Sequence, residues 1–315
     1  MKWDLEKGTN MATQTESKSG QPITVKDLNT ENPRWCAGCG DFSIVMGLKR
    51  FMVNQQLQPN ETVNVSGIGC SGRAPFYVNT YGLHSIHGRA IPVAMGLALM
   101  RPDLNLFIHS GDGDAMSIGG THLIHGINKN FNCTFILYDN EIYALTKSQT
   151  SPTTRKGHKT NTQPSGSYLD PIFPIQFALG IGGSFIAGTA DWMQDHLTST
   201  LDAAFAHKGF SFVHVNQRCP HFDPNNFDHK TSSWFSFLKH EKGIAPDKRL
   251  AEKTDIVEHD PTNKEEAFKL ASSDRPYFGL FYINPDKPCY DEILHNQVKD
   301  APTKSRAEIL DSYRI

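Results

Sequence analysis

The sequence predicts an α/β fold in which a parallel β-sheet carries helices on both faces. Segments of strand length alternate with segments of helical periodicity as far as residue 220, which is the order that a parallel sheet requires. The strand segments at residues 104–109 (LNLFIH) and 133–138 (CTFILY) are apolar throughout, as strands are when both of their faces are buried. Glycine-rich stretches follow the strand segments, and α/β sheets bind their ligands at those ends.

Composition and charge exclude several classes of protein. The chain has 315 residues, 38% of them hydrophobic, and a formal net charge of −2. This length allows one large domain or two ordinary ones, and the near-neutral charge argues against nucleic-acid or membrane-surface partners. No apolar run is long enough to cross a bilayer, and the polar N-terminus lacks the apolar core of a signal peptide. We therefore expect a soluble cytoplasmic protein with neither a nucleic-acid nor a membrane partner.

In the first half of the predicted domain, a helix begins near Asp41, which can cap it. Its apolar residues share one face, namely Ile44, Val45, Leu48, Phe51 and Met52. Residues 62–65 (TVNV) form a short strand that runs into SGIGCSGR. Residues 90–100 form an apolar helix that Pro102 ends, and the two apolar strands follow it.

The second half continues the alternation. The stretch GIGG at 180–183 lacks the flanking pattern of a dinucleotide-binding fingerprint and is interpreted as a tight turn. Residues 193–207 show helical periodicity, and residues 210–215 (FSFVHV) form the next strand. The segment 150–170 is polar, contains Pro and Gly, and is long enough to predict a functional lid over the site.

Three regions are expected along the chain. Residues 1–30 form a flexible N-terminal arm because polar residues dominate them. Residues 31–225 form the ligand-binding domain. Residues 226–315 form a C-terminal extension that packs on the core or on a partner subunit, with a helix near 263–271 and an apolar run at 277–283.

A metal-diphosphate site is predicted where two neighbouring strands end. GDGD alone could be a surface turn, but Asp112 and Asn140 lie 28 positions apart, which is about one helix plus one strand. Asp112, Asn140 and the backbone carbonyl of Ile142 offer oxygen ligands of the kind that Mg²⁺ prefers. Gly111 and Gly113 let the backbone approach phosphate. The amides that follow, near residues 114–119, can begin a helix whose N-terminus favours anionic oxygens.

Four of the six cysteines are candidate metal ligands. Cys36 and Cys39 form CAGC, Cys70 lies in GIGCSG, and Cys219 lies in NQRCP beyond a predicted strand. Zinc or an iron–sulfur cluster could take these thiolates, and spacing alone leaves both open. The neighbouring diphosphate site favours one [4Fe–4S] cluster. The remaining two cysteines, Cys133 and Cys289, are interpreted as buried thiols.

These motifs, in this order, resemble the β subunits of the two-subunit 2-oxoacid:ferredoxin oxidoreductases, most closely the 2-oxoglutarate type. The resemblance covers residues 32–220 and, more weakly, continues to residue 292. It depends on WCAGCGD, SGIGCSGR, GLHSIHGRAIPVAMG, SGDGDAMSIGG, YDNEIYALTKSQTSPTT and NQRCP. The interval from GDG to Asn140 is also similar to the thiamine-diphosphate motif, so the resemblance implies a thiamine-diphosphate-binding fold.

The resemblance implies the activity, the cofactors and the partners. The reaction is the reversible, coenzyme A-dependent oxidative decarboxylation of 2-oxoglutarate to succinyl-CoA and CO2, with electrons passed to ferredoxin. The cofactors are thiamine diphosphate, Mg²⁺ on Asp112, Asn140 and Ile142, and one [4Fe–4S] cluster. The cluster ligands are Cys36, Cys39, Cys70 and Cys219. An α subunit, in an αβ unit or a dimer of such units, supplies the glutamate that activates the cofactor, so no catalytic residue is assigned here.

Individual residues follow from the same resemblance. The residues expected to contact thiamine diphosphate are Gly69, Cys70, Ser71, His87, Gly111, Asp112, Gly113, Asp114, Asn140, Ile142, Leu145 and Thr146. Many pyruvate-type relatives have Gly-Gly-Gln where this chain has TKSQ. Lys147 is either a solvated loop lysine or a cation that binds the distal carboxylate of 2-oxoglutarate.

Three other functions remain open at this point. The substrate could be pyruvate or a broad range of 2-oxoacids. A thiamine-dependent decarboxylase without redox chemistry would share the paired Asp112 and Asn140 but would not need the four cysteines. A zinc-stabilised, non-catalytic α/β binding subunit belongs to a different class.

Overall fold

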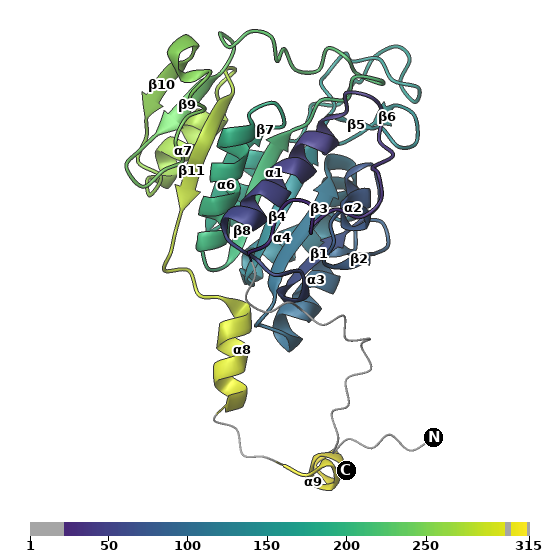
Figure 1. Ribbon diagram of the computed structural model, residues 1–315, viewed down its shortest axis with the longest axis vertical. Helices are drawn as coiled ribbons and strands as arrows, with labels where there is room; N and C mark the ends of the chain where they lie inside the picture. Colours follow the sequence, from purple (N-terminus) through teal and green to yellow (C-terminus); the bar gives the residue numbers. More distant parts are fainter. Residues whose placement is uncertain (1–21, 300–303, 314–315) are drawn as a thin grey trace.

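The computed structural model describes residues 22–299 and 304–313 (Figure 1). Within them, nine strands form one sheet in the order β10-β9-β11-β7-β8-β4-β3-β1-β2. The bounds of these strands are β1 Thr62–Ser66, β2 Tyr81–His84, β3 Asn105–Gly111, β4 Cys133–Asp139, β7 Phe185–Ala190, β8 Phe210–Asn216, β9 Ser236–Lys239, β10 Asp255–Glu258 and β11 Tyr277–Ile283. A separate hairpin pairs β5 (Ile142–Tyr143) with β6 (Gln149–Thr150).

The six strands from β7 to β2 are all parallel to one another. This confirms the predicted fold class. Strand β11 pairs antiparallel with β7 and parallel with β9. The sheet is therefore mixed, and the antiparallel pair joins the parallel part to the strands that come last in the sequence.

Helices cover both faces of the sheet (Figure 1). The helices are α1 Gly40–Asn54, α2 Ala74–Tyr77, α3 Ala90–Met100, α4 Gly120–Lys129, α5 Pro174–Ile181, α6 Gln194–Ala206, α7 Lys264–Ala271, α8 Tyr290–Lys299 and α9 Arg306–Asp311. One apolar cluster joins the sheet to α1 and α6, and a second joins its other face to α3, α4 and α5. Strand β4 serves both clusters, because Ile136 and Tyr138 face the first whereas Phe135 and Leu137 face the second.

The predicted strands and helices of the parallel core are confirmed to within one or two residues at most ends. The exceptions have local causes. Strand β7 (FIAGTA) is missing from the prediction, because its small residues resemble a loop although every one of them is buried. The helix expected near residues 114–119 is a π-helical turn over Asp114–Ile118, and α4 begins only at Gly120. The stretch GIGG ends α5, where Gly182 adopts a φ of 86°.

The expected cap at Asp41 is wrong. The residue that precedes α1 is Cys39, and Asp41 lies inside the first turn of the helix. Its carboxylate is fully buried and has no hydrogen-bond partner among the described atoms. Burial raises the pKa of Asp41 to about 7, because a buried carboxylate is costly to ionise, and the nearby thiol of Cys39 offsets only part of that cost.

Parts of the expected N-terminal arm and of the expected C-terminal extension belong to the folded domain. Residues 1–21 of the expected arm lie outside the described residues, but Ile23 and Leu28 are buried in the cluster beneath α1. The region 226–315 supplies β9, β10 and β11, so much of it continues the sheet. Helix α8 projects from the body at the opposite end from the β5–β6 hairpin (Figure 1). No helix among the described residues is long and apolar enough to span a membrane.

Lys287 connects the segment that follows β11 to helices α4 and α5. Its Nζ donates hydrogen bonds to the carbonyl oxygens of Ile127 (2.9 Å) and Gly182 (2.7 Å), at the C-terminal ends of α4 and α5. Helix ends leave such carbonyls without intrahelical partners, and a cation at this position also complements the helix dipole.

We predict that Lys287→Met lowers the free energy of unfolding by about 1–3 kcal/mol, because two hydrogen bonds from a charged donor are lost at a half-buried site. Urea unfolding of the full-length chain measures the change. Lys269→Met is the matched control, since Lys269 is exposed and pairs only with Glu265 in the same helix. Equal stability of both variants would contradict the assigned role.

Candidate active site

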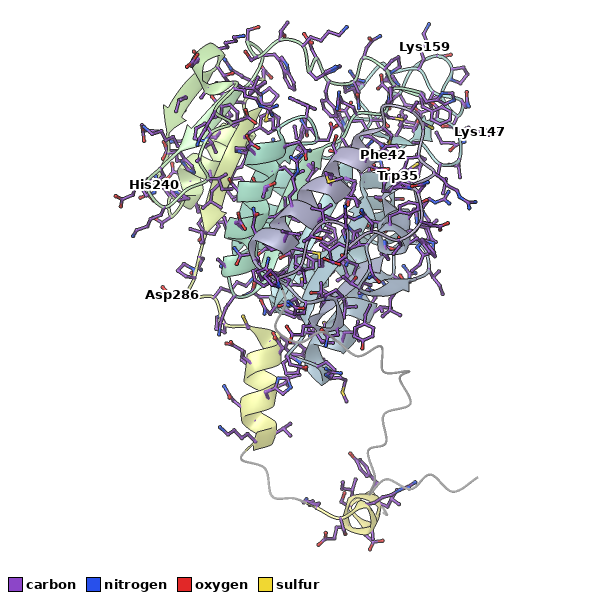
Figure 2. The ribbon with its side chains drawn as sticks, in the orientation of Figure 1. Trp35, Phe42, Lys147, Lys159, His240 and Asp286 are labelled. Atoms are coloured by element: carbon purple, nitrogen blue, oxygen red, sulfur yellow. The ribbon has the colours of Figure 1, made fainter. Side chains whose placement is uncertain are left out.

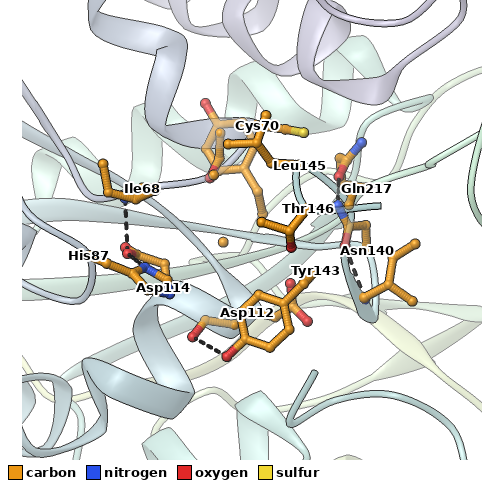
Figure 3. A pocket seen from close by; sticks show the side chains of 17 residues that line it. Ile68, Cys70, His87, Asp112, Asp114, Asn140, Tyr143, Leu145, Thr146 and Gln217 are labelled. Atoms are coloured by element: carbon orange, nitrogen blue, oxygen red, sulfur yellow. Dashed lines mark hydrogen bonds and ion pairs between the residues drawn. The ribbon is translucent and has the colours of Figure 1, made fainter. Parts of the chain in front are cut away.

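The parallel strands end at one edge of the sheet, and a cavity opens there (Figure 3). All twelve residues that the sequence associates with the cofactor line this cavity: Gly69, Cys70, Ser71, His87, Gly111, Asp112, Gly113, Asp114, Asn140, Ile142, Leu145 and Thr146. Sequence reasoning missed the other five, Ile68, Tyr138, Tyr143, Ala144 and Gln217. All five lie within the quoted motifs SGIGCSGR, YDNEIYALTKSQTSPTT and NQRCP, but their residue types do not by themselves indicate cofactor contact, and the fold shows that they line the cavity.

Asp112 is buried beside a second carboxylate. The hydroxyl of Thr153 lies 2.7 Å from Oδ2 of Asp112 and 2.8 Å from Oδ1 of Asp139, yet a hydroxyl has only one hydrogen to donate. Burial, and then the charge of Asp139, raise the pKa of Asp112 to about 7. Among the described residues, neither carboxylate forms an ion pair with Lys or Arg. This surplus of buried negative charge suits a bound cation.

Asn140 is held in a defined orientation. Its Nδ2 donates to Oε1 of Gln217 at 2.7 Å, and its Oδ1 accepts from the backbone N–H of Ile142 at 3.1 Å. An amide oxygen has a second lone pair, so Oδ1 can still bind a metal ion. Asp112, Asn140 and Ile142, the three predicted magnesium ligands, therefore line one cavity with oxygen donors of the appropriate chemistry.

Asp114 organises the cavity wall. Its Oδ1 accepts from the backbone N–H groups of Ile68 (3.0 Å) and Gly88 (2.7 Å) and lies 2.6 Å from Nδ1 of His87. Its Oδ2 accepts from Ser110. These bonds occupy the carboxylate, so Asp114 positions its neighbours, and Nε2 of His87 remains available to a ligand such as a diphosphate.

At two glycines, another side chain packs directly against the backbone where a Cβ would otherwise lie. A Cβ on Gly67 would lie 1.8 Å from a carboxylate oxygen of Asp114. A Cβ on Gly113 would lie 2.2 Å from the ring of Tyr143, whose hydroxyl donates to the Gly113 carbonyl at 3.1 Å. The absence of a Cβ at Gly113 lets the Tyr143 ring pack against the backbone, and the expected approach of a phosphate to Gly111 and Gly113 stays a prediction.

A second cavity adjoins the first, and all four predicted cluster ligands line it: Cys36, Cys39, Cys70 and Cys219. Trp35 helps to hold it together, because its Nε1 donates to the Cys70 carbonyl at 2.8 Å and its ring packs edge-on against Phe42, its neighbour in Figure 2. Gly38 provides the left-handed turn between Cys36 and Cys39 with a φ of 78°.

Burial disfavours the thiolate form of three of the four cysteines that line this cavity. Burial is the largest cause of the raised pKa of Cys39, of Cys219, and of Cys70, whose pKa reaches about 12. Backbone N–H groups of Phe222, Asp223 and His221 point at the Cys219 sulfur and favour its thiolate. Within residues 22–299 and 304–313, no three His, Cys, Asp or Glu side chains converge on a point where one metal ion could bind. The four cysteines line one common cavity.

The loop after β6 reaches back to the site. Its Thr153 forms the contacts to Asp112 and Asp139, and the hydroxyl of Thr154 donates to the Glu141 carbonyl. Arg155 pairs through Nε with Glu141 (2.6 Å) and through a terminal nitrogen with Asp223. Arg155 therefore joins three loops, those after β4, β6 and β8. The function of residues 150–170 as a lid remains a prediction.

Lys147 does not line the cavity. It lies exposed on the turn between β5 and β6, at the rim of the molecule in Figure 2. Lys147 and Ser148 have positive φ values of 74° and 68°, a conformation that costs about 1–2 kcal/mol per residue when the residue is not glycine. The two glycines of pyruvate-type relatives would relieve this strain.

Two family models match the chain. The model of the thiamine pyrophosphate enzyme C-terminal TPP binding domain matches residues 67–215, and the model of the C-terminal part of the pyruvate ferredoxin oxidoreductase β subunit matches residues 248–299. The first match covers the residues that line both cavities, except for Arg34, Trp35, Cys36, Cys39 and the residues that follow β8. The second match covers much of the region that continues the sheet beyond β7.

Relatives and solved structures give a consistent picture. The chain is 46% identical over 209 residues to the 2-oxoglutarate oxidoreductase subunit KorB of Mycobacterium tuberculosis, a match that covers 66% of this chain and 56% of that relative. It is 36% identical over 266 residues to the β subunit of 2-oxoacid:ferredoxin oxidoreductase 1 of Aeropyrum pernix, covering 82% and 80%. A 2-oxoglutarate:ferredoxin oxidoreductase from Magnetococcus marinus, solved with 2-oxoglutarate, coenzyme A and succinyl-CoA bound, matches with a TM-score of 0.82 and 30% identity. That match covers 95% of this chain and 98% of the solved chain.

We predict that Arg155→Met loosens the three joined loops and lowers the free energy of unfolding by about 1–3 kcal/mol, because two buried carboxylates lose their cation at a site where Arg155 is 42% exposed. Limited proteolysis should cleave within residues 156–173 faster than in the unaltered chain. Lys156→Met is the control, since the pair of Lys156 with Asp170 is exposed and should contribute little. Unchanged proteolysis in Arg155→Met would refute the prediction.

Proposed function

The chain belongs to the β subunits of the 2-oxoacid:ferredoxin oxidoreductases, and from this premise we propose that its enzyme catalyses the coenzyme A-dependent oxidative decarboxylation of 2-oxoglutarate. The products would be succinyl-CoA, CO2 and reduced ferredoxin, and the reverse reaction would fix CO2. One observation carries the proposal: the cavity with the oxygen ligands and the cavity with the four cysteines share Cys70, Asn140, Ala144, Leu145 and Gln217 in their walls. A thiamine cofactor and an electron acceptor would then be immediate neighbours.

Thiamine diphosphate and Mg²⁺ would occupy the first cavity. The oxygens of Asp112, Asn140 and Ile142 would hold the metal ion, whose charge would balance the buried carboxylates. His87 would contact the diphosphate through Nε2, because Asp114 binds its other ring nitrogen. When bound, thiamine diphosphate supplies the carbanion chemistry that decarboxylates 2-oxoacids, and the chain supplies its orientation and its electrostatic surroundings.

One [4Fe–4S] cluster would occupy the second cavity. Cys36, Cys39, Cys70 and Cys219 have the chemistry of a cluster binding site, and all four line this one cavity. Because the pKa values of Cys39, Cys70 and Cys219 are raised, cluster binding would displace protons from these three thiols. The wall shared with the thiamine cavity favours the cluster over zinc, and with it a redox enzyme over a zinc-stabilised binding subunit.

An α subunit would complete the site. Apolar side chains are exposed around the mouth of the first cavity and on the nearby edge of the sheet: Leu145 is 48% exposed, Ile86 76%, Ile118 50% and Leu83 41%. Exposed apolar groups of this density are typical of protein interfaces. The α subunit would bring the activating glutamate, and coenzyme A and ferredoxin would bind to the assembled enzyme.

Lys147 would select 2-oxoglutarate over pyruvate. Its left-handed backbone is costly for a lysine, and strained residues of this kind cluster at functional sites. The exposed ammonium group could reach the substrate entrance once the cavity mouth is closed by an α subunit, and there it would bind the distal carboxylate of a dicarboxylic 2-oxoacid.

Anaerobic co-purification with the α subunit tests the proposed activity. We expect about four iron and four sulfide ions per β chain and absorbance near 400 nm. We also expect viologen reduction that depends on both 2-oxoglutarate and coenzyme A. Zinc in place of iron would refute the redox function, and faster turnover of pyruvate would establish the broad-specificity or pyruvate alternative.

Lys147→Gly tests the substrate proposal. We expect the Michaelis constant for 2-oxoglutarate to rise by about 10-fold or more, the effect of losing one charge-assisted contact, while that for pyruvate changes little. The melting temperature should stay equal or rise, because glycine relieves the positive φ. Lys159→Gly is the control, being a second exposed lysine on the same side of the molecule (Figure 2). Equal effects on both substrates would defeat the proposed role.

A further inference from the structure

Gln217 lies between the two cavities and belongs to no predicted ligand set. It follows β8 directly, its side chain is 1% exposed, and it lines both cavities. Its backbone is held on both sides, because its N–H donates to the Asp139 carbonyl at 2.8 Å and its carbonyl accepts from Asn226 at 3.2 Å. A buried, well-anchored amide at this position can act on both sites.

The oxygen end of the Gln217 amide acts on the first cavity. Oε1 accepts from Nδ2 of Asn140 at 2.7 Å, as the dashed line in Figure 3 shows. This bond fixes the nitrogen end of the Asn140 amide, and the backbone N–H of Ile142 holds its oxygen end at 3.1 Å. Without Gln217, Nδ2 of Asn140 would lose its acceptor, and the weaker support from Ile142 would leave the metal-binding oxygen less well oriented.

The nitrogen end of the same amide acts on the second cavity. Nε2 lies 3.5 Å from Sγ of Cys39 and also donates to the Arg218 carbonyl. The two ends cannot be exchanged, because a reversed amide would place its nitrogen against the nitrogen of Asn140 and its oxygen against a carbonyl and a sulfur. The hydrogen-bond network alone therefore determines the orientation of the amide.

We propose that Gln217 is a positioning residue that connects the metal-diphosphate site to the iron–sulfur site. Its oxygen orients the magnesium ligand Asn140, and its N–H group donates to the sulfur of the cluster ligand Cys39. A hydrogen bond to a cluster sulfur stabilises the more negative, reduced state and raises the reduction potential. This inference depends on the proposed function, since it requires both cofactors to be bound.

Two substitutions separate the two roles. Gln217→Glu keeps an oxygen that can accept from Asn140 but removes the donor to Cys39. Gln217→Met has a similar length and removes both hydrogen bonds. Gln176→Glu is the matched control, because Gln176 lies on α5, donates to the Ala271 carbonyl and lines neither cavity.

The variants are prepared as anaerobic αβ complexes, and three quantities are measured. An EPR-monitored redox titration gives the reduction potential of the cluster. ENDOR in H2O and D2O detects an exchangeable proton coupled to the reduced cluster. Calorimetric titration of thiamine diphosphate, at fixed Mg²⁺, into cofactor-depleted protein gives its affinity.

Gln217→Glu should lose the exchangeable proton coupling and lower the potential, while its affinity for thiamine diphosphate stays close to that of the unaltered enzyme. At a fixed solution potential, the ratio of reduced to oxidised cluster should fall by roughly 2–10-fold, which is the effect of one lost hydrogen bond. Gln217→Met should also lose the exchangeable proton coupling and lower the potential. In addition, it should bind thiamine diphosphate about 10–100-fold more weakly, which is the usual effect of removing a residue that orients a metal ligand.

Several results would overturn the inference. An unchanged potential and proton coupling in both variants would remove the role at the cluster, and unchanged affinity in Gln217→Met would remove the role at Asn140. A shift of the same size in Gln176→Glu would show that any added charge has this effect. If the unaltered complex contains no iron, the proposed function itself fails, and the iron analysis distinguishes that outcome from all others.

Discussion

Parallel pairing of β3 with β4, and of β4 with β8, places Asp112, Asn140 and Gln217 at one edge of the sheet. In register, Gly111 lies opposite Tyr138, and Asp139 lies opposite Asn216, so the residue that follows each strand begins a loop at the same level. Peptide groups beyond the strand ends no longer pair with a neighbouring strand. They and the side chains beside them are free to bind ligands. Both cavities depend on this single geometric constraint, because Cys70 and Cys219 also follow strands β1 and β8 of the same set.

Buried charge is the second determinant of the site. Asp112 and Asp139 share one hydroxyl hydrogen, Asp41 has no hydrogen-bond partner among the described atoms, and burial raises the thiol pKa values of Cys39 and Cys70. Ionised carboxylates and thiolates at these positions would be costly in a structure that held no cations. A divalent metal in one cavity and iron in the other would offset the cost. The unfavourable electrostatics of the chain alone thus match the cofactors that the motifs predict.

The sequence was most informative where chemistry and backbone geometry coincide. Asp112, Asn140 and the four cysteines could be predicted because the residue type, the strand end and the spacing all point to the same chemistry. Strand β7 could not, since its small residues carry no period. Tyr143 and Thr153 lie in the quoted motif YDNEIYALTKSQTSPTT, but their contacts with Gly113 and Asp112 could not be predicted, since these contacts are tertiary. Asp41 failed as a cap because the CAGC turn, with Cys39 before the helix, shifts the helix start by two residues. The capping propensity of Asp is only a local preference. Here the turn that brings Cys36 and Cys39 to the second cavity determines where the helix begins.

The end of β4 shows how one strand can build a site and its support together. Tyr138, Asn140 and Ile142 face the first cavity, whereas Asp139 and Glu141, which alternate with them, face a different cavity of about 470 Å³ on the other side. There Asp139 binds His214 at 2.8 Å, and Glu141 binds Arg155. The period of two that alternates the side chains of a strand sets the sides of Tyr138, Asp139 and Asn140, and a left-handed turn at Glu141 (φ 63°) follows. Ligands thus lie on one side, and the hydrogen bond of His214 and the ion pair of Arg155 lie on the other. A substitution in the supporting layer should therefore disturb the ligands through the backbone, without changing any group that a cofactor would touch.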